Sequence, residues 1–196
     1  MAESDSKGLI YEAFTLLAIE KSIGGPVLWE PNLPGVIAEQ DLAYPSENNP
    51  DFVVGVTHWG SREAANKKFW RTMEDFFEVS CTFTKARFIH VLFEKNINSD
   101  DALDNLIRIT CQGRALSIQN SENIPILQGY LRSRECINQF GKGKSNILYY
   151  CRELHNKDLV FKGAIDALGH QISSLLQIDD KRDVDNLIKK EQELAS

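Results

Sequence analysis

The sequence lacks the features that identify several common classes of protein. Its 4 cysteines include no CxxC pair and no closely spaced pair of histidines accompanies them, which argues against a zinc knuckle or a redox motif. The first residues contain no basic region followed by an apolar core, and no apolar run approaches the roughly 20 residues of a membrane span. We therefore expect reduced thiols, no membrane segment and a cytoplasmic location.

Positive charge is also scarce. The chain has 22 Lys and Arg residues against 28 Asp and Glu residues, which gives a net charge of −6. Such a chain has no overall electrostatic footprint for nucleic acid, so DNA binding would need a local basic patch. An acidic nuclease is still compatible with this charge, because bound cations restore positive potential at the phosphate. The 42% hydrophobic content predicts a folded protein with a substantial core.

Helical and strand patterns alternate in the first half of the chain. Apolar spacing predicts a helix that ends at the glycine pair Gly24-Gly25, and a later helix capped by Ser61. Valine-rich or alternating segments predict strands, and a segment with four prolines predicts a long loop. The predicted elements are helices over 6–23 and 61–77, strands over 26–31, 51–59, 78–84 and 86–94, and a loop over 31–50.

The second half predicts mainly α-helix. Caps, acidic first turns and amphipathic spacing predict helices over 99–116, 124–140, 144–158, 159–177 and 183–196. We expect an α/β core in residues 1–98 and a helical region in residues 99–196 that packs on it. The last residues continue a charged helical pattern, so we expect the chain to be a fragment of something longer.

One segment brings two acidic residues to the starts of two predicted strands. In "PDFVVGVTHWGSREAANKKFWRTMEDFFEVS", residues 50–80, Asp51 opens the first strand and Glu78 opens the second. Carboxylates that meet at a sheet edge are the ligands that metal-dependent phosphodiester cleavage needs. Two plainer interpretations stay open: Asp51 caps a turn while Glu78 ends a helix, or the chain is a helical interaction module whose two carboxylates lie far apart.

This segment resembles the PD-(D/E)XK nuclease superfamily, which includes many type II restriction endonucleases. The resemblance rests on Pro50-Asp51, the strand that follows, "EVS" at 78–80 and the intervening helix, and it covers residues 8–95 best. It implies a mixed central sheet flanked by helices, with Mg²⁺ held by Asp51 and Glu78. It also implies a glutamate on the first helix, for which Glu12 in "GLIYEAF" is the better match.

Ser80 departs from the family pattern, because it stands where the family has lysine. Losing a positioned cation from the transition state commonly costs several kcal/mol, so we expect a weak or inactive enzyme. Three explanations stay open: the cation has moved to Lys85 or Lys67, the protein is an inactivated subunit, or the lysine was replaced to trap a bound complex. A non-catalytic DNA-binding or assembly subunit is the alternative function.

A basic cluster lies on the helix between the two acids. Arg62, Lys67, Lys68 and Arg71 fall within ten residues, and Lys67 and Arg71 are neighbours on the helix surface. Such a cluster would contact the phosphates of double-stranded DNA, although a solvated helix face is an equal interpretation. The loop and the helical second half would read the target sequence. By resemblance, a homodimer or a partner subunit is also expected.

Overall fold

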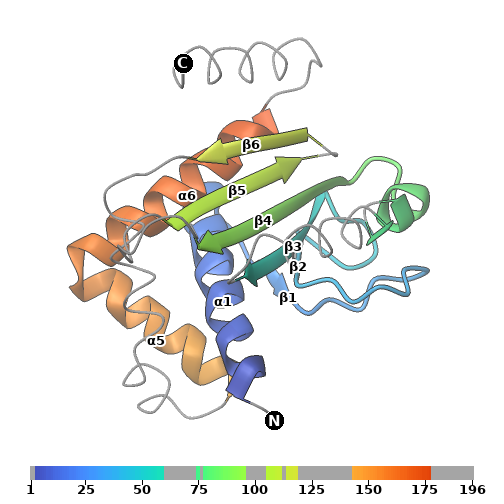
Figure 1. The fold of residues 1–196 in the computed structure, drawn as a ribbon. Helices are drawn as coiled ribbons and strands as arrows, with labels where there is room; N and C mark the ends of the chain where they lie inside the picture. The colour runs from blue at the N-terminus through green and yellow to red at the C-terminus, as the bar shows by residue number, and fades with distance from the viewer. Residues whose placement is uncertain are drawn as a thin grey trace, which may run out of the picture.

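The protein is a mixed α/β structure built on a six-stranded sheet (Figure 1). The computed structural model describes residues 3–59, 74–75, 77–95, 105–111, 114–118 and 143–177. The helices are α1 (Glu3–Ile23), α5 (Lys144–Lys157) and α6 (Leu159–Gln177). The strands are β1 (Leu28–Trp29), β2 (Leu42–Tyr44), β3 (Phe52–Trp59), β4 (Arg87–Lys95), β5 (Asn105–Cys111) and β6 (Arg114–Ile118).

The strands follow the order of the sequence across the sheet, from β1 to β6. Neighbours are antiparallel except for β3 and β4, which run parallel with Val54 beside Ile89. A parallel pair needs a crossover connection, usually a helix. Residues 74–75 and 77–82 of that connection are helical. The parallel pair β3 and β4 therefore forms the centre of the sheet.

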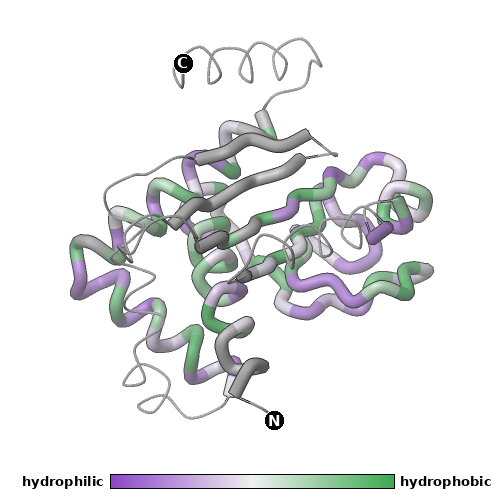
Figure 2. The backbone as a smooth tube through the Cα atoms, in the orientation of Figure 1, coloured by the Kyte–Doolittle hydropathy of each residue, from purple (hydrophilic) through white to green (hydrophobic). Residues whose placement is uncertain are grey.

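One face of the sheet is covered by helices. Phe52 and Val54 from β3 and Ile89 and Val91 from β4 pack against α1, α5 and α6 in the large core cluster. Alternate residues of a strand point to the same face, which explains this selection. Green and purple segments alternate along α5 and α6 in Figure 2, as expected of helices with one buried side.

The close packing of α1 on α6 depends on Gly169. A Cβ atom at this position would lie 2.4 Å from the backbone oxygen of Ala18 and 3.0 Å from Cβ of Ser22. Only a residue without a side chain lets the two backbones approach so closely. Phe14 of α1 and Phe161 of α6 meet edge to face beside this crossing, with ring centroids 5.7 Å apart.

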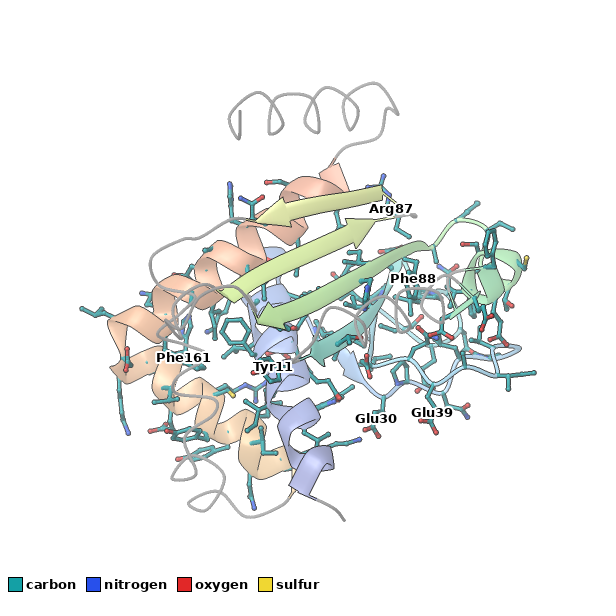
Figure 3. The ribbon with its side chains drawn as sticks, viewed as in Figure 1. Tyr11, Glu30, Glu39, Arg87, Phe88 and Phe161 are labelled. Atoms are coloured by element: carbon teal, nitrogen blue, oxygen red, sulfur yellow. The ribbon has the colours of Figure 1, made fainter. Side chains whose placement is uncertain are left out.

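Loops and the helical turn at residues 77–82 cover part of the opposite face of the sheet. The apolar cluster there is small and contains Leu33, Ala43, Val53, Val79 and Phe88. Figure 3 shows Tyr11 and Phe161 among the helices and Phe88 on the side of the loops. We call the two sides the helical face and the loop face.

The helix predicted over residues 99–116 is wrong, because β5 and β6 occupy residues 105–111 and 114–118. Ile107 and Ile109 alternate with polar residues along β5, and β5 pairs with β4 over its whole length. A helix was predicted because the acidic residues at the start of this segment are typical of a helix N-terminus, and this signal was given more weight than the strand alternation. The second half of the chain is therefore not purely helical, and its strands extend the same sheet as the first half.

Two further differences lie on the loop face. Residues 78–82 are helical rather than a strand, and the backbone N–H of Phe83 donates to the oxygen of Val79 over 2.7 Å. The loop predicted over 31–50 contains the short strand β2. The predictions of α1, β1, β3, β4, α5 and α6 are confirmed.

Other predictions fall outside the described residues. These are the helices over 124–140 and 183–196, most of the helix over 61–77, and the boundary at residue 98. Within the described residues, no helix combines the length and apolar character that crossing a bilayer requires.

Candidate functional site

A polar cavity lies beyond the end of β2, beside a part of β3 that pairs with no other described strand on that side. β2 pairs with Phe52–Val54 of β3, and the cavity adjoins the next residues, Gly55–Thr57. Its volume is about 770 Å³. The lining residues are Glu12, Ile37, Ala38, Glu39, Gln40, Asp41, Gly55, Val56, Thr57, Glu74, Asp75, Glu78, Phe88 and His90.

The lining is dominated by carboxylates. Six of its residues are acidic, and neither lysine nor arginine is among them. The acids come from α1, from the loop before β2 and from the helical residues before β4. The cavity therefore extends around the edge of β3, from the loop face to α1. Oxygen-rich sites of this kind suit hard divalent cations.

Glu12 lies on α1 and is held by a neighbouring strand. Its Oε2 accepts a hydrogen bond of 2.7 Å from the indole Nε1 of Trp29 in β1. Burial raises the pKa of Glu12 above its ordinary value of 4.5, while the Trp29 bond and the charge of Lys144 act in the opposite direction. Lys144 lies 5.7 Å from the centre of the Trp29 ring and forms an ion pair with Glu30. Glu12 is thus a positioned carboxylate with a raised proton affinity.

Asp41 binds a backbone N–H of β3 that a neighbouring strand would otherwise bind. Its Oδ2 accepts the backbone N–H of Val56 over 2.5 Å, two residues beyond Val54, the last residue that β2 pairs. Asp41 was not predicted from the sequence, because no sequence pattern shows which loop carboxylate will contact β3. The available signal was its position directly before the short apolar run Leu42–Tyr44.

Glu78 binds the loop that precedes β2. One carboxylate oxygen accepts the N–H of Ile37 over 2.5 Å, and the other accepts the N–H of Ala38 over 3.1 Å. These two bonds to backbone N–H groups fix the orientation of the carboxylate. Glu78 and Glu12, which the sequence places 66 positions apart (78 − 12), line the same cavity.

The floor of the cavity is formed by the parallel pair of strands. His90 is only 4% exposed, and its Nε2 lies 3.0 Å from Oγ1 of Thr57. Gly55 lies beside His90, and a Cβ atom there would contact His90 Cδ2 at 3.6 Å and Phe88 Cζ at 3.5 Å. Because Gly55 has no side chain, the cavity stays unfilled above this position.

Asp51 is separated from this group. It is exposed at the start of β3, and it does not line the cavity. It precedes Gly55 by four residues, which in a strand corresponds to about 13 Å. Its backbone joins β2 and β4: its N–H donates to Tyr44 and its oxygen accepts from Arg87. The structure thus brings Glu12 and Glu78 to one cavity but not Asp51.

The remaining predicted site residues are placed as follows. Ser80 is half-buried on the helical turn and Lys85 is exposed in the turn before β4, and neither lines the cavity. The basic residues Arg62, Lys67, Lys68 and Arg71 lie outside the described residues.

The carboxylate oxygens of the cavity suit Mg²⁺, but the carboxylates lie too far apart to hold one ion together. Carboxylate oxygens are the ligands that Mg²⁺ prefers. In the part of the chain that the structure describes, however, no group of three or more His, Cys, Asp or Glu side chains is close enough to hold one ion. Coordination by Glu12, Asp41 and Glu78 together would need their side chains to move toward one another.

Comparisons with known proteins add no family assignment. No family model, curated protein or solved structure matches the chain. The resemblance to PD-(D/E)XK nucleases therefore rests on the sequence segment alone.

Proposed function

We propose that this chain is a Mg²⁺-dependent DNA endonuclease domain of a restriction system, related to the PD-(D/E)XK nucleases and weakened at Ser80. One observation carries the proposal. Glu12 and Glu78 were assigned to the site from distant parts of the sequence, and both line one acidic cavity. The mixed sheet with a helix-containing crossover between β3 and β4 is compatible with the fold that this function requires.

The proposed site consists of Glu12, Asp41 and Glu78. Asp41 replaces Asp51 in this assignment, because Asp41 lines the cavity and Asp51 does not. A bound cation would neutralise phosphate charge and polarise the attacking water. The chain's own contribution is to hold the carboxylates: Trp29 orients Glu12, the Val56 N–H orients Asp41, and two loop N–H groups orient Glu78.

Duplex DNA is the proposed substrate. Arg62, Lys67, Lys68 and Arg71 would contact its phosphates, and residues 31–49 would contact the target sequence. A homodimer or a partner subunit would supply the second cut.

The test is cleavage of mixed-sequence plasmid DNA with Mg²⁺ and with Mn²⁺. The variants are Ser80→Lys alone and Ser80→Lys combined with Glu12→Gln, Asp41→Asn or Asp51→Asn. We expect Ser80→Lys to cut at discrete sites, because it restores the lysine that the family pattern has two residues after Glu78. Glu12→Gln and Asp41→Asn should abolish this cutting.

Asp51→Asn is the matched control for Asp41→Asn. Retained cutting with Asp51→Asn would assign the reaction to the cavity. Loss with Asp51→Asn and retention with Asp41→Asn would return the site to the assignment made from the sequence. Absence of cutting by every variant, together with no Mn²⁺ binding in calorimetry, would refute the nuclease proposal.

A non-catalytic DNA-binding or assembly subunit is the second candidate. Ser80 favours it, and so does Glu78, whose two oxygens already hold the backbone of a loop. This candidate predicts duplex binding without cleavage, including by Ser80→Lys. Duplex binding measured beside the cleavage assay separates the two functions.

A further inference from the structure

The loop along one side of the acidic cavity has a shape that its own sequence specifies. We call residues 33–40 the rim loop. It starts with a turn in which the N–H of Val36 donates to the oxygen of Leu33 over 3.2 Å, and Gly35 has a φ of 79°. Proline followed by glycine at the two central positions, as in Pro34-Gly35, is typical of a type II turn. The start of the rim loop therefore depends on glycine at position 35.

The helical turn at 77–82 holds the rim loop through two side chains. The hydroxyl of Thr82 donates to the oxygen of Gly35 over 3.3 Å. The two carboxylate oxygens of Glu78 accept one N–H group each, from Ile37 over 2.5 Å and from Ala38 over 3.1 Å. Both oxygens of Glu78 are thus bound to the rim loop.

This contact keeps Glu78 from the position that metal binding requires. Mg²⁺ takes its oxygen ligands at roughly 2.1 Å, so carboxylates that share one ion have to converge on it. Among the residues described, no three acidic, histidine or cysteine side chains converge in this way. The N–H groups that orient Glu78 in the present arrangement therefore also keep it apart from Glu12 and Asp41.

Glu78 is the acid of these three that can move at the lowest cost. Glu12 accepts the indole N–H of Trp29 in β1, and Asp41 accepts a backbone N–H of β3, so both are held by strands of the sheet. The partners of Glu78 belong to a loop, and its bond from Ile37 is exposed. Water can replace an exposed hydrogen bond at a small net cost. Convergence of the acids therefore requires first of all that Glu78 leave the rim loop.

We propose that the contact between Glu78 and the rim loop is autoinhibitory, because Glu78 must release this loop before it can join the other acids around a divalent cation. This inference rests on the proposed function and deepens it, by naming a contact that regulates the same site. It also explains why the cavity has an acidic lining whose members lie too far apart to share an ion. Only molecules in which Glu78 is free are competent to bind, so weakening the loop contact tightens binding.

The first experiment measures Mn²⁺ affinity by isothermal titration calorimetry, in variants that weaken the loop contact and leave Glu78 unaltered. Thr82→Val removes the hydroxyl that binds the oxygen of Gly35. Gly35→Ala places a side chain at a left-handed φ, with Cβ 3.3 Å from Cγ2 of Thr82. We expect both variants to bind Mn²⁺ about threefold to tenfold more tightly than the parent chain, since a lost bond or added strain favours release of Glu78.

Two matched variants separate this effect from a general loss of stability. Thr82→Ser keeps the hydroxyl and should bind Mn²⁺ as the parent chain does. Gly24→Ala introduces the same kind of backbone strain, since Gly24 has a φ of 76°, but it lies directly after α1 and outside the rim loop. It should lower the melting temperature without a change in Mn²⁺ affinity.

Amide hydrogen exchange of the parent chain supplies a second readout, with an unambiguous sign. We expect Mg²⁺ to accelerate exchange at Ile37 and Ala38 about fivefold or more, because their N–H groups lose the carboxylate that binds them. If Glu78 held the ion and the rim loop at the same time, Mg²⁺ would slow exchange at these amides. The control amide is that of Asn32, which donates to Glu47 outside the cavity lining and should not change.

The outcomes distinguish this inference from the proposed function. Mn²⁺ binding by the parent chain that Glu12→Gln weakens, with no gain in Thr82→Val or Gly35→Ala, would overturn the inference alone. Slower exchange at the two rim-loop amides in Mg²⁺ would do the same. Absence of Mn²⁺ binding by the parent chain and by every variant would overturn the inference and the nuclease proposal together.

Discussion

The two faces of the sheet are built on different principles. The helical face buries large apolar residues from α1, α5 and α6 against β3 and β4. Among the described residues, the loop face buries five apolar residues in its cluster, beside a cavity lined by six acids. Burial of apolar area is the main source of stability, so the helical face stabilises the fold. The loop face brings acidic groups together in one cavity, and repulsion between like charges opposes folding.

The largest expected effect comes from removing an aromatic ring from the helical face. Phe161 is 1% exposed and packs against Phe14. Phe161→Ala should lower the free energy of unfolding by about 3–5 kcal/mol. Phe88→Ala on the loop face should cost less, since Phe88 already borders the cavity. Urea denaturation of both variants checks this order, and a larger loss for Phe88→Ala would contradict the division of roles.

A methyl group at the helix crossing tests how tightly the helical face is packed. Gly169→Ala would place Cβ against the backbone of Ala18, which has no rotamer by which to move aside. We expect a loss of about 1–3 kcal/mol, although alanine favours helix formation. Thermal unfolding measures the effect, with Gly163→Ala on the same helix as the control. A gain in stability would show that α1 and α6 can separate at little cost.

Removing a buried hydroxyl group on the loop face should have a smaller effect. Thr57→Val removes the hydroxyl that lies 3.0 Å from His90 Nε2 in a buried setting. Losing this partner should cost about 1–2 kcal/mol. Thr57→Ser keeps the hydroxyl and should lose less. A larger loss for Thr57→Ser than for Thr57→Val in chemical denaturation would mean that the methyl group of Thr57, not its hydroxyl, matters.

The smallest effect should have the opposite sign. Burial raises the pKa of Glu12, so the folded state binds this proton more tightly than the unfolded state does. Stability then falls as pH rises from the ordinary value of 4.5 through the folded pKa, and the ionised form stays unfavourable above it. Glu12→Gln keeps an acceptor for Trp29 without the charge, so it should raise the melting temperature at neutral pH.

The pH dependence of that gain is the sharper test. Below pH 4.5 both the folded and unfolded states of the parent chain are protonated at Glu12. The difference between Glu12→Gln and the parent should therefore shrink toward acid. A difference that stays constant with pH would show that Glu12 acts through packing and not through its charge.

The helical face was more predictable from the sequence than the loop face. Helical spacing from Leu9 to Ile23 and the valines of β3 fixed α1 and β3 locally, and the structure confirms both. β5 was missed because its pairing with β4 is a tertiary contact that outweighs the helix cap before it. Residues 78–82 were missed because a short helical turn has no periodicity long enough to recognise.

The candidate site was predictable only in part, for a similar reason. The resemblance proposed Glu12 and Glu78, which line one cavity, and Asp51, which does not. Asp41 entered the site through a hydrogen bond to Val56 across the end of β2. Contacts of this kind depend on where a loop crosses a strand, and loop paths leave little trace in composition or spacing.

The bond from Val56 to Asp41 also bears on how the protein behaves at high concentration. A strand edge with unpaired N–H groups is a template on which another chain can add a strand. Asp41 occupies the first such N–H after β2 stops, and it brings a charge that an incoming strand would have to bury. The carboxylate therefore opposes the addition of a strand at this point of β3, where the sheet borders the cavity.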